Sequence, residues 1–276
     1  MRLLTCSLLL LLTGCANGIF YHPSRQMLPP PTERGVQVDV EPVRFTASDG
    51  TALTGWWLPA AGTPKGTVVH FHGNAHNMTS HVQYAEWLPN KGYNLFVFDY
   101  RGYGASSGRP SRSGLILDGI AALKSVVADN EFTPPLLVWG QSLGGTVALQ
   151  AVKNSDAPVE AVLIDSTFTG YGDIAAEKMR PFPWWLQPLR LFRPLLISNG
   201  PDAAEAIPHL TDIRLAFLHG EQDRVIPAHH SKELHALTPE NTPILLVPNA
   251  SHCDAVLRFP DKVRPWILDF FETQNK

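Results

Sequence analysis

A serine at position 142 has the neighbours of an activated nucleophile. Gly140 and Gly144 lie two positions to either side of Ser142, between an apolar run and a helical pattern. A turn this tight strains the serine backbone, and glycine on both sides removes side chains that would clash. The pattern predicts an exposed hydroxyl above a helix amino terminus, where the N–H of Leu143 can stabilise an oxyanion. The alternative is a glycine-rich turn with an incidental serine.

A serine hydroxyl needs a base that takes its proton, and the base needs a partner that fixes its tautomer. Two later residues fit these roles, because Asp223 follows the apolar run at 214–220 and His252 follows the next run. A single aspartate or histidine is more often a solvated loop residue, so its position after a strand decides. Asp165, which follows an earlier apolar run, is the alternative acid. We predict Asp223 as the acid and His252 as the base.

Four histidines lie within twelve positions, at His70, His72, His76 and His81. His70 and His72 lie two apart, on one face of a strand, as paired metal ligands can. The H-x-H-x-D-H pattern of metallo-β-lactamase-like enzymes is nevertheless broken, because Asn74 replaces the aspartate and His76 is displaced by one position. We therefore predict no metal here, and expect the turn at 72–74 to supply a second oxyanion N–H from Asn74.

Short apolar runs precede each of these candidate residues. The runs are nearly continuous, as in strands of a parallel sheet that is covered on both faces. They span 66–73, 93–100, 135–140, 160–165, 214–220 and 243–248. Two earlier segments, 36–47 and 51–59, alternate apolar and polar residues and are predicted to form edge or antiparallel strands.

Helical patterns separate the apolar runs. The clearest places apolar residues on one helix face with spacings of four, three and four, at Ile116, Ile120, Leu123 and Val127. This alternation predicts an α/β fold with a doubly wound, mostly parallel eight-stranded sheet and a small helical cap insert. Chemistry in such sheets gathers at the carboxyl ends of the strands, which the candidate residues follow.

The amino terminus combines an early positive charge at Arg2 with a leucine-dominated run that is too short to cross a bilayer. We interpret it as a signal peptide; an uncleaved anchor or a buried strand is the alternative. The segment 12–15 resembles the lipobox of bacterial lipoproteins, which implies cleavage before Cys15 and acylation of that residue. Ala16 follows the cysteine, which by resemblance to enterobacterial sorting favours the periplasmic face of the outer membrane.

The composition excludes one class of partner and predicts no disulfide. The 22 Lys and Arg residues are offset by 25 Asp and Glu, without a strongly basic run, so we expect no nucleic-acid binding. Cys6 would leave with the signal peptide and Cys15 would carry lipid. Cys253 would remain as a packed thiol, so no intramolecular disulfide is expected.

The predicted organisation is a signal peptide at 1–14, a linker at 15–35 and a domain at 36–276, with the cap insert at about 166–206. The insert is rich in proline and tryptophan. Trp184 and Trp185 are expected to line an apolar substrate wall over the nucleophile, although they could simply pack the cap onto the body. Three nearby arginines, Arg180, Arg190 and Arg193, could instead hold the cap against anionic lipid.

Together these motifs resemble the α/β-hydrolase superfamily, in its serine-aminopeptidase-like branch. The resemblance spans roughly 38–273 and includes HFHGNAHN, FDYRGYGASSGRPS, GQSLGG, HGEQDRVIP and NASH, in the branch's order. It implies a catalytic triad of Ser142, Asp223 and His252, with oxyanion N–H groups from Leu143 and Asn74. His76 departs from the pattern, because relatives often have glycine there.

The resemblance implies acyl hydrolysis through an acyl-enzyme, without a cofactor. The substrate would be a small-molecule ester, thioester or amide, and the leaving group and oligomeric state are left open. The competing function is a non-catalytic envelope lipoprotein that binds a ligand in the cleft. We expect a serine hydrolase tethered to a bacterial membrane through Cys15.

Overall fold

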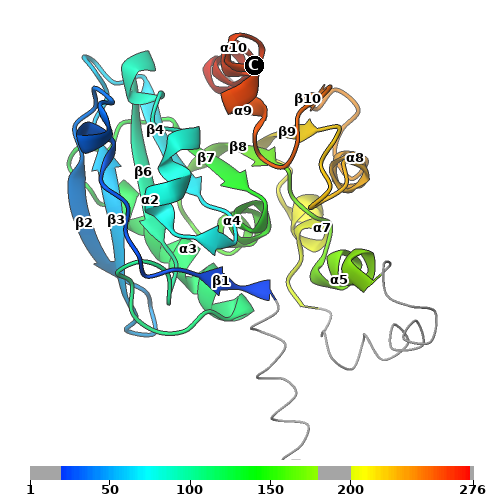
Figure 1. The fold of residues 1–276 in the computed structure, drawn as a ribbon, viewed down its shortest axis with the longest axis horizontal. Coiled ribbons are helices and arrows are strands. Elements are labelled where there is room, and N and C mark those ends of the chain that lie inside the picture. Colours follow the sequence, from blue (N-terminus) through cyan, green and yellow to red (C-terminus); the bar gives the residue numbers. More distant parts are fainter. Residues whose placement is uncertain (1–19, 180–199, 274–276) are drawn as a thin grey trace, which may run out of the picture.

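A computed structural model describes residues 20–179 and 200–273 of the chain. Its centre is an eight-stranded sheet with the strand order β10-β9-β8-β7-β4-β6-β3-β2 (Figure 1). The strands are β2 (Glu41–Thr46), β3 (Ala52–Leu58), β4 (Gly66–Phe71), β6 (Tyr93–Asp99), β7 (Leu136–Gln141), β8 (Val159–Asp165), β9 (Arg214–Gly220) and β10 (Ile244–Val247). β3 is antiparallel to β2 and β6, and the other neighbouring pairs are parallel. The predicted mostly parallel eight-stranded sheet is confirmed.

Helices pack on both faces of the sheet. One core contains residues of α3 (Arg112–Val127), α4 (Leu143–Lys153), α5 (Tyr171–Met179), α7 (Ala203–Ala206) and α8 (His229–His235). The other contains residues of α2 (Met78–His81), α9 (Ala255–Arg258) and α10 (Pro260–Glu272). Short 3-10 helices span Pro31–Arg34, Val82–Tyr84, Pro89–Lys91 and Ile207–His209. Val138 of β7 joins the first core and its neighbours Leu137 and Trp139 join the second, as alternation along a strand requires.

The buried face of α3 is shifted by about one residue along the sequence from the predicted face. Ile116, Ile120 and Val127 are half-buried, and the fully buried stripe instead includes Leu115 and Asp118. The Asp118 carboxylate accepts hydrogen bonds from Nε and Nη2 of Arg101, at 3.0 and 2.8 Å. The apolar pattern could not reveal this buried face, because the charged residue Asp118, paired with Arg101, lies within it.

Residues 20–28, which we call the N-terminal strap, are bound to the domain although they fall within the predicted linker. The strap contains β1 (His22–Pro23), which pairs in parallel with β5 (Ala75–His76). Its N–H at Ser24 donates to the carbonyl oxygen of His76 at 2.9 Å, and its N–H at Leu28 donates to Thr79 Oγ1 at 2.9 Å. Figure 1 shows the strap, in dark blue, leading from β1 past α2.

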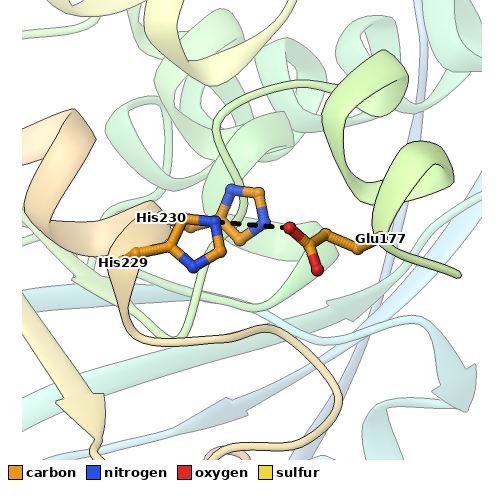
Figure 2. A group of neighbouring side chains, drawn as sticks. All are labelled: Glu177, His229 and His230. Carbon is orange, nitrogen blue, oxygen red and sulfur yellow. Dashed lines mark ion pairs between the residues drawn. The ribbon is translucent and has the colours of Figure 1, made fainter. Parts of the chain in front are cut away.

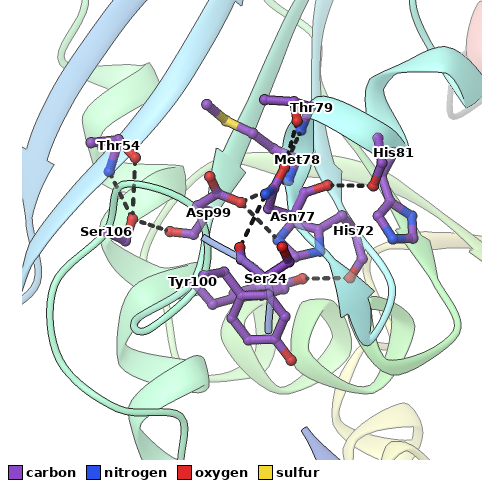
Figure 3. Close-up of polar contacts among 12 residues, drawn as sticks. Ser24, Thr54, His72, Asn77, Met78, Thr79, His81, Asp99, Tyr100 and Ser106 are labelled. Carbon is purple, nitrogen blue, oxygen red and sulfur yellow. Dashed lines mark hydrogen bonds and ion pairs between the residues drawn. The ribbon is translucent and has the colours of Figure 1, made fainter. Parts of the chain in front are cut away.

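Asn77 binds the strap through its side-chain amide, whose nitrogen and oxygen each form two hydrogen bonds (Figure 3). Its Nδ2 donates to the carbonyl oxygens of Ser24 and Gln26, at 3.0 and 2.8 Å. Its Oδ1 accepts from the N–H and Oγ1 of Thr79, which caps the start of α2. Only 1% of Asn77 is exposed. The strap is therefore held by a residue at the start of α2, just after β5.

Replacing Asn77 by alanine is expected to lower the free energy of unfolding by about 2–3 kcal/mol, because several partly buried backbone groups lose their partner. Urea unfolding followed by tryptophan fluorescence measures this loss. Asn90→Ala is the matched control, because the exposed Asn90 makes a single 3.3 Å bond to the carbonyl oxygen of Gln37. Its effect should stay within about 0.5 kcal/mol. Equal losses in the two variants would contradict the role given to Asn77.

Several sequence predictions lie outside the described residues, namely the signal peptide, Cys15, Trp184, Trp185 and the three arginines of the insert. Within the parts of the chain that the structure describes, no helix is long and apolar enough to span a membrane.

Candidate active site

Ser142 lies at the turn between β7 and α4. Its φ is 54° and its ψ is −119°, in a region that non-glycine residues rarely adopt. A Cβ on Gly140 would lie 2.6 Å from the Cα of Gly145, and a Cβ on Gly144 would collide with the carbonyl oxygen of Phe71. The two glycines therefore allow α4 to start tightly against the ends of β7 and β4.

The Ser142 hydroxyl is the first member of a hydrogen-bonded chain. It lies 3.0 Å from Nε2 of His252, and Nδ1 of His252 lies 2.7 Å from Oδ2 of Asp223. Because a carboxylate only accepts, Nδ1–H donates to Asp223, which leaves the Nε2 lone pair facing the hydroxyl. Ser142 is 7% exposed, less than the turn alone predicts, because His252 and the loop at Gly73 lie over it. The arrangement has the geometry of a nucleophile, a base and an acid.

Asp223 is held as a carboxylate by its neighbours. Burial alone would raise its pKa, but hydrogen bonds from His219 and His252 outweigh this and hold the pKa of Asp223 below its usual range. Nε2 of His219 lies 3.2 Å from Oδ2, and the N–H groups of Val225 and Ile226 donate to Oδ1 at 2.8 and 2.9 Å. A fixed anion therefore faces the imidazole of His252.

Asp165, the alternative acid, has different partners. Its Oδ2 accepts from Nε2 of Gln141 and its Oδ1 accepts from the hydroxyl of Ser166, both at 2.9 Å. Burial raises the pKa of Asp165, and the two hydrogen bonds offset this only in part. Within the described residues, no hydrogen bond joins Asp165 to His252. The geometry favours Asp223 over Asp165 as the partner of the histidine.

Two backbone N–H groups are candidates for the oxyanion site. Leu143 is the first residue of α4, so its N–H has no acceptor within the helix. A Cβ on Gly73 would lie 3.6 Å from the Cβ of Ser142, so the loop that carries Asn74 touches the nucleophile's turn. Among the described residues, neither N–H donates to a protein acceptor. The Asn74 side chain is engaged elsewhere, because its Oδ1 accepts from the N–H of His22 at 3.0 Å.

The histidines at positions 70–81 do not direct their ring nitrogens at a common point. Nε2 of His70 lies 2.9 Å from Oε1 of Gln141, and burial lowers the pKa of His70 to about 3. Nδ1 of His72 donates to the carbonyl oxygen of Gly73 at 2.7 Å, and His76 is exposed. Among the described residues, these three histidines form no group with converging ligand atoms.

A different group of metal-ligand types lies between α5 and α8 (Figure 2). Glu177, His229 and His230 each place one ligand atom within 4.8 Å of the others. The N–H of Thr169 donates to Nδ1 of His230 at 3.3 Å, so the ring proton belongs on Nε2, which then has no lone pair for a metal. His229 Nε2 lies 3.5 Å from Glu177 Oε1. The group fits a polar contact between two helices better than a metal centre.

His219 is a site residue that sequence reasoning missed. It is fully buried and lies four positions before Asp223. Its Nδ1 accepts from Ser231 Oγ at 2.6 Å, and the single proton on its Nε2 is shared between the carbonyl oxygen of Ile226 at 2.8 Å and Oδ2 of Asp223 at 3.2 Å. The only signal in the sequence was a histidine at the end of an apolar run, which does not distinguish a support residue from a core residue.

A large surface hollow of about 960 Å³ lies away from Ser142, at the opposite edge of the sheet. Ile213 and Arg214 at the start of β9, and Leu237 and Pro243 before β10, form part of its wall. Among the residues that the structure describes, its lining contains no serine, cysteine or histidine. The chemistry of the side chains, rather than the size of a cavity, identifies the candidate active site.

Two esterases are among the solved structures with a similar fold. The esterase Pf2001 of Pyrococcus furiosus superposes with a TM-score of 0.72, over 92% of this chain and 97% of the esterase, at 22% identity. An esterase of Exiguobacterium antarcticum superposes with a TM-score of 0.62, over 84% of this chain and 99% of that chain, at 17% identity. At these identities the likeness shows the fold alone.

Sequence relatives identify the family. The protein YfhR of Escherichia coli K12 is 36% identical over 92% of this chain and 87% of its own length. The α/β-hydrolase domain-containing protein WAV2 of Arabidopsis thaliana is 30% identical over 83% of this chain and 77% of its own length. The family model described as serine aminopeptidase, S33 matches residues 62–199, a range that includes Ser142 and ends before Asp223. The chain therefore belongs to the serine aminopeptidase S33 family of α/β-hydrolases.

Proposed function

We propose that this hydrolase is a serine acyl hydrolase that cleaves an ester, or a related thioester or amide, and that a lipid on Cys15 tethers it to a bacterial membrane. One observation carries the chemical part, namely the hydrogen-bonded chain from the Ser142 hydroxyl through His252 to Asp223. The lipobox-like segment at 12–15 is the support for the tether.

The reaction follows from this chain of groups. Oγ of Ser142 attacks the substrate carbonyl while Nε2 of His252 takes its proton. The N–H groups of Leu143 and Asn74 stabilise the oxyanion that forms. The imidazolium then gives its proton to the leaving group, which departs and leaves the acyl group on Ser142. Water, deprotonated by the same imidazole, hydrolyses the acyl-enzyme and restores the serine.

A non-catalytic lipoprotein that binds a ligand in the same cleft is the competing function. It has less support, because a binding protein has no need of a strained serine, an imidazole and a carboxylate joined in one hydrogen-bonded chain. Purified mature protein assayed against ester, thioester and aminoacyl-amide substrates separates the two functions. We expect turnover of at least one acyl substrate class, whereas binding without turnover would favour the competing function.

We expect the insert to set the preferred acyl chain length. Trp184 and Trp185 lie in an apolar segment that joins α5 to α7 in the chain. If they form a wall over Ser142, each methylene that they bury adds about 0.8 kcal/mol until the pocket is full. The optimum in kcat/KM for p-nitrophenyl esters from acetate to palmitate should therefore shift in Trp184→Ala/Trp185→Ala. An unchanged profile with weaker liposome binding would assign them to membrane docking.

Hydrolysis is expected to survive metal removal, because the proposed steps use only Ser142, His252, Asp223 and backbone N–H groups. Treatment with a chelator, followed by desalting, should leave kcat/KM within about two-fold of its starting value. Ser142→Ala, treated in parallel, gives the background rate. Loss of activity that zinc restores would instead favour a metallohydrolase.

A further inference from the structure

The N-terminal strap shortens the distance between the proposed lipid and the domain. If residues 15–35 were all a free linker, Cys15 could lie far from the body. The strap, however, is bound from Phe20 onward. The Phe20 ring packs edge-on against Tyr171 with ring centroids 5.3 Å apart, and the Tyr21 hydroxyl donates to that of Tyr171 at 3.2 Å. Only five peptide steps then separate Cys15 from Phe20, which is a reach of at most about 18 Å.

This reach is short compared with the molecule. A domain of this length has a radius of gyration of about 19 Å, which corresponds to about 45–50 Å across. We call the segment from Cys15 to Phe20 the leash. With a reach of at most about 18 Å, the leash cannot place the lipid at the opposite face of the domain. The face on which the strap starts must therefore lie next to the bilayer that holds the lipid.

The strap starts beside the candidate active site. The N–H of His22 donates to Oδ1 of Asn74 at 3.0 Å, and Asn74 follows Gly73, whose Cβ position lies 3.6 Å from the Cβ of Ser142. At its middle the strap contacts the loop after β6, because the N–H of Gly104 donates to the carbonyl oxygen of Ser24 at 2.9 Å. The strap thus lies along the carboxyl ends of β4 and β6, the edge at which Ser142 lies.

Apolar side chains are exposed along this edge. Met27 and Leu28 of the strap are 38% and 43% exposed, and Val225, in the loop after β9, is 46% exposed. Leu237 is 46% exposed as well, but it lies at the opposite edge of the sheet, in the wall of the large hollow. Exposed apolar side chains beside a lipid anchor can enter the headgroup region of a bilayer.

We infer that the strap holds the carboxyl ends of the strands, where Ser142 lies, against the bilayer that carries the Cys15 lipid, and that the substrate is an acyl ester resident in that bilayer. The inference rests on the proposed acyl hydrolysis and tether. It narrows the substrate class from small acyl compounds in general to amphipathic lipids, which can reach Ser142 without leaving the membrane.

The decisive experiment lengthens the leash. A Gly/Ser insert of about 25 residues between Asn17 and Gly18, with an average span of roughly 28 Å, would free the orientation while keeping the lipid. Lipidated protein is reconstituted in vesicles of phosphatidylethanolamine with a minority of phosphatidylglycerol. A phospholipid with a fluorogenic acyl ester and water-soluble p-nitrophenyl acetate serve as substrates. The insert should slow phospholipid hydrolysis about ten-fold or more and leave acetate hydrolysis within about two-fold.

Matched controls test whether the effect of the insert comes from a changed orientation of the domain on the bilayer. The same insert placed after Thr273 should leave both rates unchanged. Met27→Ser/Leu28→Ser should slow phospholipid hydrolysis alone, whereas Leu237→Ser should slow neither reaction. Cys15→Ser, which lacks the lipid, should lose phospholipid hydrolysis at equal bulk concentration and keep acetate hydrolysis.

The outcomes separate this inference from the proposed function. Equal phospholipid rates with the short and the lengthened leash would overturn the inference while acetate hydrolysis upheld the proposed function. A loss of both reactions on lengthening would also overturn it, because the strap would then be acting on the catalytic loop itself. A wild-type protein that hydrolyses neither these substrates nor any other acyl class would refute the proposed function instead.

Discussion

Replacing Ser142 by alanine is expected to abolish labelling by a fluorophosphonate probe and to lower kcat by roughly 10⁴- to 10⁶-fold. The probe reacts with a serine whose proton has an acceptor and whose developing oxyanion has donors. Ser142 meets the first condition through Nε2 of His252 at 3.0 Å, and the second through the N–H groups of Leu143 and Asn74, to which we assign the oxyanion site.

The control for this prediction is Ser155→Ala. Ser155 is half-buried, and among the described residues its hydroxyl forms a single hydrogen bond, from the N–H of Ala157, so it has no base beside it. Its variant should label and turn over like the wild type. Both substitutions keep a Cβ, so the strained backbone at position 142 is retained and the melting temperatures should agree. A folded wild type that the probe does not label would show that the three groups do not act together, and would support a ligand-binding protein.

The sequence predicted the parts of the fold that depend on local pattern. Continuous apolar runs identified the parallel strands, and the glycines around Ser142 identified the turn between β7 and α4. The positions of Asp223 and His252 followed because residues after parallel strands meet at one edge of the sheet. Hydrophobic periodicity and turn chemistry therefore suffice to bring these three residues into one region.

Contacts between distant polar residues could not be predicted in this way. The strap lies within the proline-containing segment 15–35, whose composition resembles a linker, and nothing local shows that Asn77 binds the carbonyl groups of the strap. In the same way, His219 lies only four positions before Asp223, but its ring is held by the hydroxyl of Ser231 in α8, which the apolar pattern does not show. Such contacts arise from the tertiary arrangement, which overrides local propensity.

The choice between the two candidate acids leads to the second large effect. Asp223→Asn should lower kcat by roughly 10³- to 10⁴-fold, because a neutral amide no longer stabilises the imidazolium of His252 and can hold the wrong tautomer. The depressed pKa of Asp223 supports this role, since the hydrogen bonds from His219 and His252 favour its ionised form despite burial. Measuring kcat against the ester that the wild type cleaves best gives the size of the effect.

Asp165→Asn is the matched substitution, since it makes the same chemical change at a buried aspartate nearby. Asp165 bonds to Gln141 and Ser166, and burial raises its pKa, so it is a poor candidate for the anion that faces His252. Its variant should keep kcat within about ten-fold and instead lose about 1–3 kcal/mol of unfolding free energy, because an amide donor would face one of the two donors. A large loss of kcat in Asp165→Asn with unchanged stability, together with a small loss of kcat in Asp223→Asn, would show that Asp165, at the end of β8, is the acid. The two variants therefore distinguish a carboxylate that orients and stabilises the catalytic base from a carboxylate that stabilises the fold at the ends of β7 and β8.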